Sequence, residues 1–383
     1  MTSRERTLIV LAAGGSGGHV FPADALANEL AKRGCRLTLV TDRRGGAFSG
    51  FLTKVETHRV LAGGIVGKSF ARRLQSPPEL AIGAWQAWRL LKRLRPAAVI
   101  GFGGYASIPT MLAACFGGYP TAIHEQNAVL GRANRMLASR VEHIATCFES
   151  VDGLPPGAEA KVAQTGMPVR PAIAAVRERP YPELDDRSPV NILVFGGSQG
   201  ARVFSDVVPE AMNRLDNSVK ARLRIIQQCR PEDLERVGAA YAGFGITAKL
   251  DSFFTDIPDR LAATHLVIAR AGASTVAEVT AVGRPAILVP YPYAIDHHQD
   301  RNAYAIDTAG AGWLMTEQAF NKATLASRLD SLIGLPAILT KAAECAKAAG
   351  RPEAVQSLAD IVIDMFPKGG TNGGGSVPRK LAA

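Results

Sequence analysis

Short apolar runs alternate with helix candidates from the N-terminus onward. In the first half, strands are predicted at 8–13, 36–40, 97–101 and 121–124, with a helix at 23–33. In the second half, strands are predicted at 191–195, 224–228, 266–269 and 286–289, and helices at 203–215, 274–282 and 353–365. Such alternation is typical of βαβ units, so the pattern predicts an α/β protein with parallel sheets.

A proline-rich break separates the two halves. Residues 165–189 hold five prolines among many charges, which is typical of a domain connection. A chain of 383 residues also suits two domains of roughly 150–200 residues each. We expect an N-terminal Rossmann-like domain at 1–168, onto which helix 350–366 packs back, and a second Rossmann-like domain at 169–349. The glycine-rich tail at 367–383 lacks apolar periodicity and is predicted to be disordered.

The two halves carry matching glycine turns. LIVLAAGGSGG at 8–18 aligns with NILVFGGSQGA at 191–201, each with Gly-Gly-Ser after an apolar strand. Glycine allows a tight turn and close ligand approach, and the following helix start favours a phosphate. A purely structural glycine turn remains the alternative at each site. Two turns in register favour a duplicated nucleotide-binding fold that grips a phosphorylated ligand between the domains.

The charge of the chain narrows the choice of partner. A net charge of +10 and a pI of about 9.6 favour an anionic partner. Aromatic content is only 6%, and no RNP motif or zinc finger occurs, so nucleic acid is not expected. The five cysteines are scattered and never form C-x-x-C, which is typical of reduced cytosolic thiols. Segment 96–123 is long enough to span a bilayer, but its glycines and prolines predict strand, loop, short helix and strand.

Two common nucleotide motifs fit this chain poorly. In a dinucleotide fingerprint the third glycine would fall on Val20, although Asp42 stands where a ribose-binding acid could lie. The near P-loop at 63–69 lacks its first glycine, which falls on Ala62, and no strand leads into it. We therefore reject the P-loop and keep NAD binding as a weak alternative.

A polar cluster in the second half carries a stronger signal. RAGASTVAE at 270–278 follows a strand and opens a helix, so its backbone N–H groups could hold a phosphate, and Glu278 could accept both hydroxyls of a ribose. A capped helix with a solvated glutamate is the alternative. The next loop, PYPYAIDHHQDRN at 290–302, includes His297 and His298, but no further spaced ligands stand nearby and no Asp-x-Asp occurs. No metal site is expected.

The first half offers a candidate base. His19 directly follows the glycine turn, where a neutral imidazole could accept a proton from an attacking hydroxyl. A structural histidine is the alternative. GFGGY at 101–105 and HEQN at 124–127 also follow strands, so both should line the same sheet edge, around a second phosphorylated ligand.

Together these motifs resemble one family. GGSGGHVFPA, GFGGY, HEQN, GMPVR, GGSQGAR, RAGASTVAE and DHHQDRNA occur in this order between residues 8 and 366. They are similar to those of the bacterial peptidoglycan N-acetylglucosaminyltransferases, the MurG family of glycosyltransferase family 28. The resemblance implies a GT-B fold, in which the parallel sheets of two Rossmann-like domains face each other across a cleft. It also implies transfer of GlcNAc from UDP-GlcNAc to the C4 hydroxyl of undecaprenyl-diphospho-MurNAc-pentapeptide (lipid I), with inversion and with neither cofactor nor metal.

The resemblance also assigns residues. The second domain would bind UDP-GlcNAc, and the first would take the acceptor, with His19 as base. Donor contacts would come from Ser16, Gly17, Gly18, Asn127, Arg170, Ser198, Phe254, Ala273, Ser274, Thr275, Val276, Ala277, Glu278 and Gln299. The acceptor side would include Gly103, Gly104, Tyr105, Glu125 and Gln126. The chain departs from the family pattern at Ser16 (often threonine), Met167 (usually asparagine) and Phe254 (commonly aliphatic).

A lipid acceptor would require a membrane-docking face. Segment 65–95 mixes basic residues with aromatic and aliphatic ones, which suits an anionic interface. The docking candidates are Ile65, Lys68, Phe70, Arg72, Arg73 and Trp85. An ordinary amphipathic helix with a solvated basic face is the alternative. The resemblance implies a peripheral location at the cytoplasmic face of the inner membrane, where other cell-wall synthesis proteins could be partners.

Two other functions remain open at this point. A UDP-GlcNAc epimerase of the same fold would need catalytic carboxylates in the cleft. A non-catalytic nucleotide-binding module would leave the second glycine turn and the loop at 296–302 unexplained.

Overall fold

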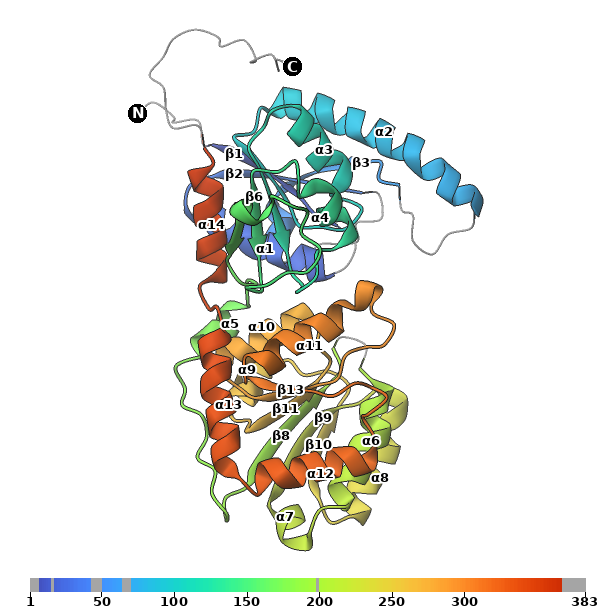
Figure 1. Cartoon of the computed structure of the whole chain (residues 1–383), viewed down its shortest axis with the longest axis vertical. Helices are drawn as coiled ribbons and strands as arrows, with labels where there is room; N and C mark the ends of the chain where they lie inside the picture. The colour runs from blue at the N-terminus through green and yellow to red at the C-terminus, as the bar shows by residue number, and fades with distance from the viewer. Residues whose placement is uncertain (1–6, 15–16, 43–49, 64–69, 198–199, 367–383) are drawn as a thin grey trace.

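The chain forms two α/β units arranged end to end along the long axis of the molecule (Figure 1). The computed structural model describes residues 7–14, 17–42, 50–63, 70–197 and 200–366. The predicted tail at 367–383 and the candidate residues Ser16, Ile65, Lys68 and Ser198 lie outside these ranges.

The first unit is built on a parallel sheet. Its strands within the described ranges follow the order β3-β2-β1-β4-β5-β6-β7. They are β1 (Leu8–Ala12), β2 (Arg36–Asp42), β3 (Glu56–Val60), β4 (Ala98–Gly101), β5 (Thr121–Glu125), β6 (His143–Thr146) and β7 (Val162–Gln164). The helices are α1 (Gly17–Lys32), α2 (Phe70–Leu94), α3 (Ile108–Phe116), α4 (Arg132–Leu137) and α14 (Ala354–Asp364), with short 3₁₀ turns at Gly50–Lys54 and Glu159–Lys161.

Apolar residues cover both faces of this sheet. Ile9 and Leu11 of β1 pack in one core cluster, and Val10 and Ala12 pack in another. Successive side chains of a strand point to opposite faces, so a strand covered on both sides must be apolar throughout. This requirement explains why the uninterrupted apolar runs of the sequence are strands.

The second unit repeats this plan. Its described strands are parallel in the order β10-β9-β8-β11-β12-β13. They are β8 (Val190–Phe195), β9 (Leu223–Gln228), β10 (Thr247–Asp251), β11 (Leu266–Ala269), β12 (Ala286–Leu288) and β13 (Gly312–Leu314). The helices are α5 (Pro171–Ala175), α6 (Arg202–Asn213), α7 (Asn217–Arg222), α8 (Leu234–Gly243), α9 (Ile257–Ala262), α10 (Ala273–Val282), α11 (His298–Thr308), α12 (Lys322–Ile333) and α13 (Pro336–Ala349), with 3₁₀ turns at Pro231–Asp233 and Ile295–His297.

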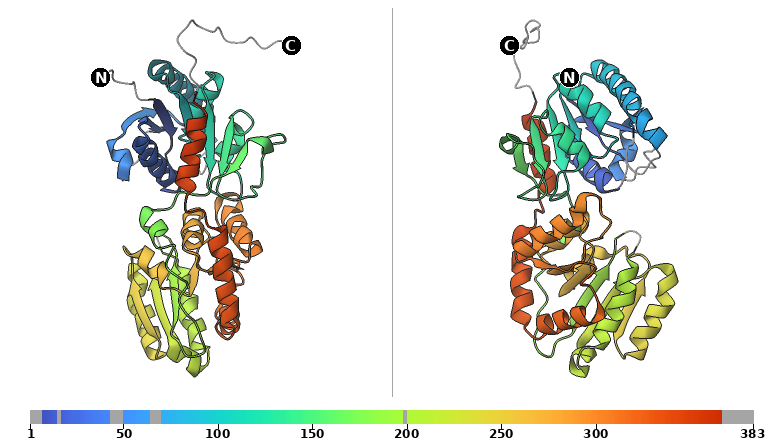
Figure 2. Two further views of the ribbon diagram at one scale, coloured as in Figure 1. Left: turned by 90° about the vertical axis from the view of Figure 1, so that its left-hand side faces the viewer. Right: turned by 45° about the vertical axis from the view of Figure 1, so that its right-hand side comes forward.

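The C-terminal helix α14 returns to the first unit. Figure 2 shows α14 alongside the first sheet and α13 alongside the second. Leu358, Ala359 and Val362 of α14 share a core cluster with Ile9 and Leu11. The chain therefore crosses between the units twice, after β7 and after α13.

The two crossings touch at Gly166. This glycine has φ +86°, and a Cβ placed on it would lie 2.4 Å from Cβ of Arg351 in the second crossing. Only glycine combines this backbone angle with such close contact. The joint between the units is therefore closely packed at this point.

The predicted strands are confirmed, with ends shifted by at most two residues in the second sheet and the central strands of the first. Segment 96–123 forms β4, α3 and β5, and no helix within the described ranges is both long and apolar enough to span a bilayer. The prediction of a helix starting at 23 was wrong: α1 begins at Gly17 and contains Pro22. Pro22 is the sixth residue of α1, where it removes one intrahelical hydrogen bond, and the helix continues through it, so Pro22 does not mark the boundary.

Candidate active site

A cavity of about 470 Å³ lies between the two units. Both sheets present the carboxyl ends of their strands to it. The first unit lines it with Gly18, His19, Gly103, Gly104, Tyr105, Glu125, Gln126, Asn127, Val129, Gly131, Arg132, Ala133 and Asn134. The second unit lines it with Gly272, Ala273, Ser274, Thr275, Ile295, Asp296 and His298. The cavity thus brings together most residues predicted for the first-unit wall and for the start of helix α10.

The first wall is formed where the sheet order reverses. The chain leaves β1 toward β2 and β3 on one side, and β4 and β5 lie on the other. Open α/β sheets bind ligands at such a switch point, outside the carboxyl ends of the strands. His19 follows β1, the GFGGY turn follows β4, and the HEQN motif spans the end of β5. The three motifs therefore meet at this switch point.

The His19 ring lies over the glycine turn. A Cβ on Gly103 (φ +82°) would stand 3.3 Å from Cε1 of His19, and one on Gly104 (φ +70°) would stand 3.1 Å from its Cδ2. Glycine is therefore needed at both positions for two reasons: the φ angles are positive, and a side chain would enter the space that the His19 ring occupies.

Gln126 contacts the same ring from the end of β5. Its Oε1 lies 3.1 Å from Nδ1 of His19, and its Nε2 donates to the carbonyl oxygens of Phe102 (3.1 Å) and His124 (3.0 Å). His124 behind it is fully buried, and this burial lowers its pKa to about 4. The His124 ring is therefore neutral near pH 7.

Glu125 fixes the loop that follows β5. Its carboxylate accepts hydrogen bonds from the backbone N–H of Asn127 (3.0 Å) and Gly131 (2.9 Å) and from Nδ2 of Asn134 (2.8 Å). These donors hold both of its oxygens. Glu125 thus shapes the wall from which Asn127 reaches toward the second unit.

The second wall is the N-terminus of α10. Gly272 is its N-cap residue and contributes no side-chain hydrogen bond. The backbone N–H groups at such a start and the helix dipole together favour an anion. Ala273, Ser274 and Thr275 line the cavity there, opposite His19.

Arg170 and Glu278 pair with each other. Nε and Nη2 of Arg170 donate to the two carboxylate oxygens of Glu278 at 2.8 and 3.0 Å. The pair joins the residue before α5 to the middle of α10, one helical turn from the cavity. Bidentate pairs of this kind fix both side chains in direction.

Four other predicted donor residues lie outside the lining of this cavity: Phe254, Val276, Ala277 and Gln299. Phe254 is buried beneath Arg260, whose guanidinium lies 4.2 Å from the ring centroid. Gln299 accepts a hydrogen bond from the backbone N–H of Tyr291 at 2.9 Å. Val276 and Ala277 line a second cavity of about 490 Å³, which shares Ala273 with the first and extends toward the crossings.

Asn302 links the two units and was not predicted as a site residue. It is fully buried in α11, and its Oδ1 accepts from the backbone N–H of Ala128 at 2.8 Å. Its Nδ2 donates to Oδ1 of Asn127 (3.1 Å) and to the carbonyl of Ala271 (3.0 Å). Its place in the DHHQDRNA motif was the only signal in the sequence, because its partners are distant along the chain.

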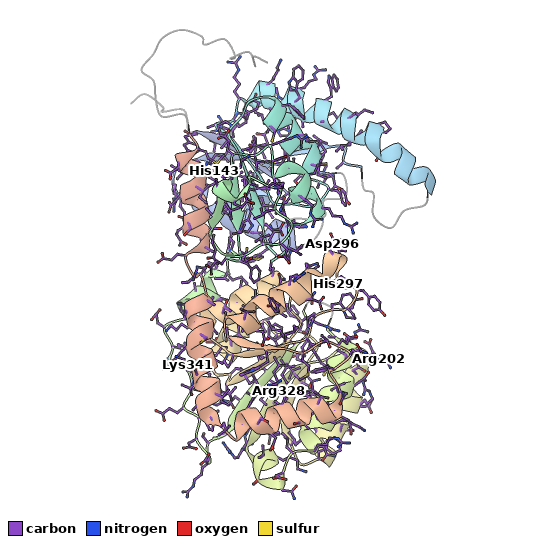
Figure 3. The ribbon with its side chains drawn as sticks, viewed as in Figure 1. His143, Arg202, Asp296, His297, Arg328 and Lys341 are labelled. Atoms are coloured by element: carbon purple, nitrogen blue, oxygen red, sulfur yellow. The ribbon has the colours of Figure 1, made fainter. Side chains whose placement is uncertain are left out.

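The loop before α11 reaches across to the first unit. Figure 3 shows Asp296 and His297 on the part of the second unit that faces the first. Asp296 accepts a bidentate ion pair from Arg132, which lowers the pKa of its carboxyl. Asp296 and His297 both have φ near +50°, an uncommon backbone conformation for non-glycine residues that often marks functional sites. His297 and His298 are adjacent in this loop, but no three His, Cys, Asp or Glu side chains in the described ranges are placed to share a metal.

Two Rossmann-like sheets whose strand ends share one cleft define a GT-B glycosyltransferase fold. The N-terminal domain of glycosyltransferase family 28 matches residues 9–146, and the C-terminal domain of the same family matches residues 191–358. The chain belongs to glycosyltransferase family 28.

Two relatives are similar to this chain over nearly its whole length. A protein of Paramagnetospirillum magneticum is 57% identical over 365 residues, covering 95% of this chain and 98% of that relative. One of Rhodospirillum rubrum is 54% identical over 358 residues, covering 92% and 91%. Both are named UDP-N-acetylglucosamine–N-acetylmuramyl-(pentapeptide) pyrophosphoryl-undecaprenol N-acetylglucosamine transferase.

Solved structures show the same fold. The crystal structure of Acinetobacter baumannii MurG has a TM-score of 0.77 and 29% identity, covering 94% of this chain and 99% of that one. A UDP-GlcNAc 2-epimerase from Neisseria meningitidis has a TM-score of 0.61 but only 13% identity over 94% of this chain and all of its own. The latter likeness concerns the fold alone.

Proposed function

We propose that this chain transfers GlcNAc from UDP-GlcNAc to the C4 hydroxyl of undecaprenyl-diphospho-MurNAc-pentapeptide, forming lipid II and UDP. The observation that carries the proposal is the cavity itself, in which the His19 imidazole stands opposite the N-terminus of α10. A base and an anion site on opposite walls are what a direct glycosyl transfer from a nucleotide diphosphate requires. The names of the high-identity relatives support the same reaction.

The proposed reaction is a single displacement. His19 takes the proton of the acceptor hydroxyl as its oxygen forms a bond to C1 of GlcNAc. The bond from C1 to the diphosphate oxygen breaks on the opposite face, so the configuration inverts. The negative charge that develops on UDP faces the backbone N–H groups of Ala273–Thr275, which stabilise it without a metal.

The donor would extend from α10 into the second unit. Glu278 would accept the ribose hydroxyls, and Arg170, already oriented by Glu278, would offset the diphosphate charge. Gly17 and Gly18 of the first unit would approach the sugar end, as would Asn127, while Gln299 would contact the GlcNAc hydroxyls. Ser16 and Ser198 would add hydroxyl contacts at the two glycine turns, and Phe254 a backbone contact to uracil.

This assignment divides the work between the units. The first sheet, with α14 packed on it, would form the acceptor domain, and Gly103, Gly104 and Tyr105 would face the acceptor. The second sheet would form the UDP-GlcNAc domain. The crossings near 166 and 351 would be the joint between the two domains.

Labelled UDP-GlcNAc tests the reaction against its alternatives. Incubation with a lipid I analogue should release UDP only when the acceptor is present, and a chelator should leave the rate unchanged. Acceptor-independent formation of ManNAc would instead indicate an epimerase, and no chemistry would indicate a binding module. His19→Ala should lower kcat by roughly 10²–10⁴-fold if His19 is the base, and a loss below tenfold would assign it a structural role.

Helix α2 is the proposed contact with the membrane at the cytoplasmic face. Its described part exposes Ile82 and Trp85, at 48% and 54% of their surfaces. The guanidinium of Arg89 lies 5.0 Å from the Trp85 ring centroid, and Lys92 lies 3.8 Å from that of Trp88. Exposed aromatic and aliphatic groups beside cations suit an interface with anionic lipid. Phe70, Arg72 and Arg73 lie in the first turn of the same helix.

Liposome sedimentation tests this surface. Changing Lys68, Arg72 and Arg73 to glutamate should reduce binding to anionic vesicles and spare turnover of a water-soluble acceptor. The matched control changes Lys322, Arg328 and Lys341 to glutamate, since all three are exposed on the second unit. Figure 3 shows Arg328 and Lys341 there. Equal binding by both triple variants would refute the docking site.

A further inference from the structure

A chain of side chains runs from the joint between the units to the His19 ring. It passes from the carbonyl of Gly166 to His124, then to Gln126, and ends at His19. Each link is a hydrogen bond whose direction follows from the chemistry of the partners. The protonation of every ring nitrogen can therefore be worked out in turn.

The orientation of the Gln126 amide comes first. Its Nε2 lies 3.1 Å from the carbonyl oxygen of Phe102 and 3.0 Å from that of His124. Carbonyl oxygens only accept, so the NH₂ group must face them, because a flipped amide would place its oxygen against two others. The amide oxygen therefore faces His19.

The tautomer of His124 agrees with this orientation. Its Nε2 lies 3.2 Å from the carbonyl of Gly166, so Nε2 carries the proton. Since burial keeps this ring neutral, its Nδ1 is an acceptor, and Nε2 of Gln126 lies 3.1 Å away as donor. The two N–H groups of the amide thus face three acceptors, so one hydrogen is shared between two of them.

The last link sets His19. Its Nδ1 lies 3.1 Å from Oε1 of Gln126, which can only accept, so Nδ1 must donate. We propose that Gln126, held by His124 and the Phe102 carbonyl, is a positioning residue that keeps His19 in its Nδ1–H tautomer and leaves Nε2 as the proton acceptor in the cleft. In the described ranges, no hydrogen bond involves Nε2 of His19. The inference rests on the proposed function for its catalytic meaning, but not for the tautomer itself.

An amide suits this task better than a carboxylate. A carboxylate at Nδ1 would also orient the ring, yet its negative charge would favour the imidazolium, which cannot accept a proton. Among the described residues, the other titratable or charged groups around His19 are His124 behind Gln126, Tyr105, Glu125 and Arg132 on the same wall, and Asp296 and His298 across the cavity. Glu125 is held by its own donors and Asp296 by Arg132, so the contact to Nδ1 comes from a neutral group.

Nitrogen NMR reads the tautomer directly. The full-length protein is labelled with ¹⁵N-histidine, and the His19 signals among its seven histidines are assigned by their loss in His19→Gln. The wild type should show a protonated Nδ1 and an unprotonated Nε2. In Gln126→Met, which has similar length but no acceptor, the Nε2–H form should increase, whereas Gln126→Glu keeps an acceptor oxygen and should keep Nδ1–H.

The control is another buried glutamine. Gln227→Met removes a bond to the Tyr241 hydroxyl within the second unit, away from the cleft, and should leave the His19 tautomer unchanged. A wild-type His19 protonated at Nε2 would overturn the proposal even if Gln126→Met fails to fold. An unchanged tautomer in folded Gln126→Met would overturn it as well.

Kinetics separate this inference from the proposed function. Gln126→Met should lower kcat by about tenfold or more, the scale of one lost orienting hydrogen bond, with KM for UDP-GlcNAc changed less than about threefold. A retained kcat with a shifted tautomer would overturn the catalytic meaning of the positioning. Absence of acceptor-dependent transfer in the wild type, with the NMR result as expected, would refute the proposed function and leave the tautomer assignment standing.

Discussion

The buried amide of Asn302 provides a sharp test of how the two units are held together. The side chain lies in the second unit and makes three hydrogen bonds, two to the first unit and one within its own unit. It accepts from the Ala128 N–H at 2.8 Å and donates to Oδ1 of Asn127 at 3.1 Å and to the Ala271 carbonyl at 3.0 Å. Asn302→Ala removes all three without altering the backbone of α11.

The expected loss of stability comes from the buried polar groups that lose Asn302 as their hydrogen-bond partner. A buried backbone donor or acceptor without its partner costs about 1–3 kcal/mol. Ala128 N–H and the Ala271 carbonyl each lose this partner, so the free energy of unfolding should fall by about 2–6 kcal/mol. Ala271 directly precedes Gly272, the N-cap residue of α10, so the anion site should also shift against the first wall. A misplacement near 1 Å can cost about 10²-fold in rate.

Urea unfolding and steady-state kinetics measure the two effects together. The matched control is Asn191→Ala, which removes one bond to the Ala263 carbonyl inside the second unit and should cost below about 1 kcal/mol. If Asn302→Ala lowers the free energy of unfolding by less than about 0.5 kcal/mol and leaves kcat/KM unchanged, Asn302 does not hold the two units together.

Three further predictions follow from single contacts. Between pH 7 and pH 5, the wild type should lose about 2 kcal/mol more unfolding free energy than His124→Gln. The unfolded imidazole gains a proton below about pH 6.5, while the buried ring, with its pKa lowered to about 4, stays neutral; parallel pH curves from urea titrations would contradict this. Gly104→Ala should lower kcat by about tenfold or more, because its Cβ would press on the His19 ring at 3.1 Å, while calorimetric UDP binding should change little. Gly83→Ala should lower Tm by about 4 °C or more in scanning calorimetry, because its Cβ would lie 1.7 Å from the carbonyl oxygen of Leu61 and force α2 away from the first sheet. An unchanged Tm would show that α2 moves aside at no cost.

Much of the architecture could be read from the sequence because its causes are local. Strands buried on both faces must be apolar throughout, and helix starts that bind phosphate need glycine nearby. These constraints act over a few residues, so they marked the motifs at the strand ends and the strands β1, β2, β4, β5, β8, β9, β11 and β12. The edge strands β3 and β10 were missed for the same reason: they carry exposed polar residues, so no apolar run marks them. The strands β6, β7 and β13 were missed as well, because each has only three or four residues.

Only the tertiary structure decided which side chains meet. His19 and Gln126 stand 107 positions apart, Arg170 and Glu278 stand 108 apart, and Ala128 and Asn302 stand 174 apart. Apart from its place in the DHHQDRNA motif, nothing in the local pattern distinguishes Asn302 from a solvated helix residue, because its burial depends on contacts with the first unit. The sequence by itself placed His19 beside the cleft as a candidate base. The packed structure decided which of its nitrogens faces Gln126, because hydrogen-bond direction depends on partners that only the fold brings within reach.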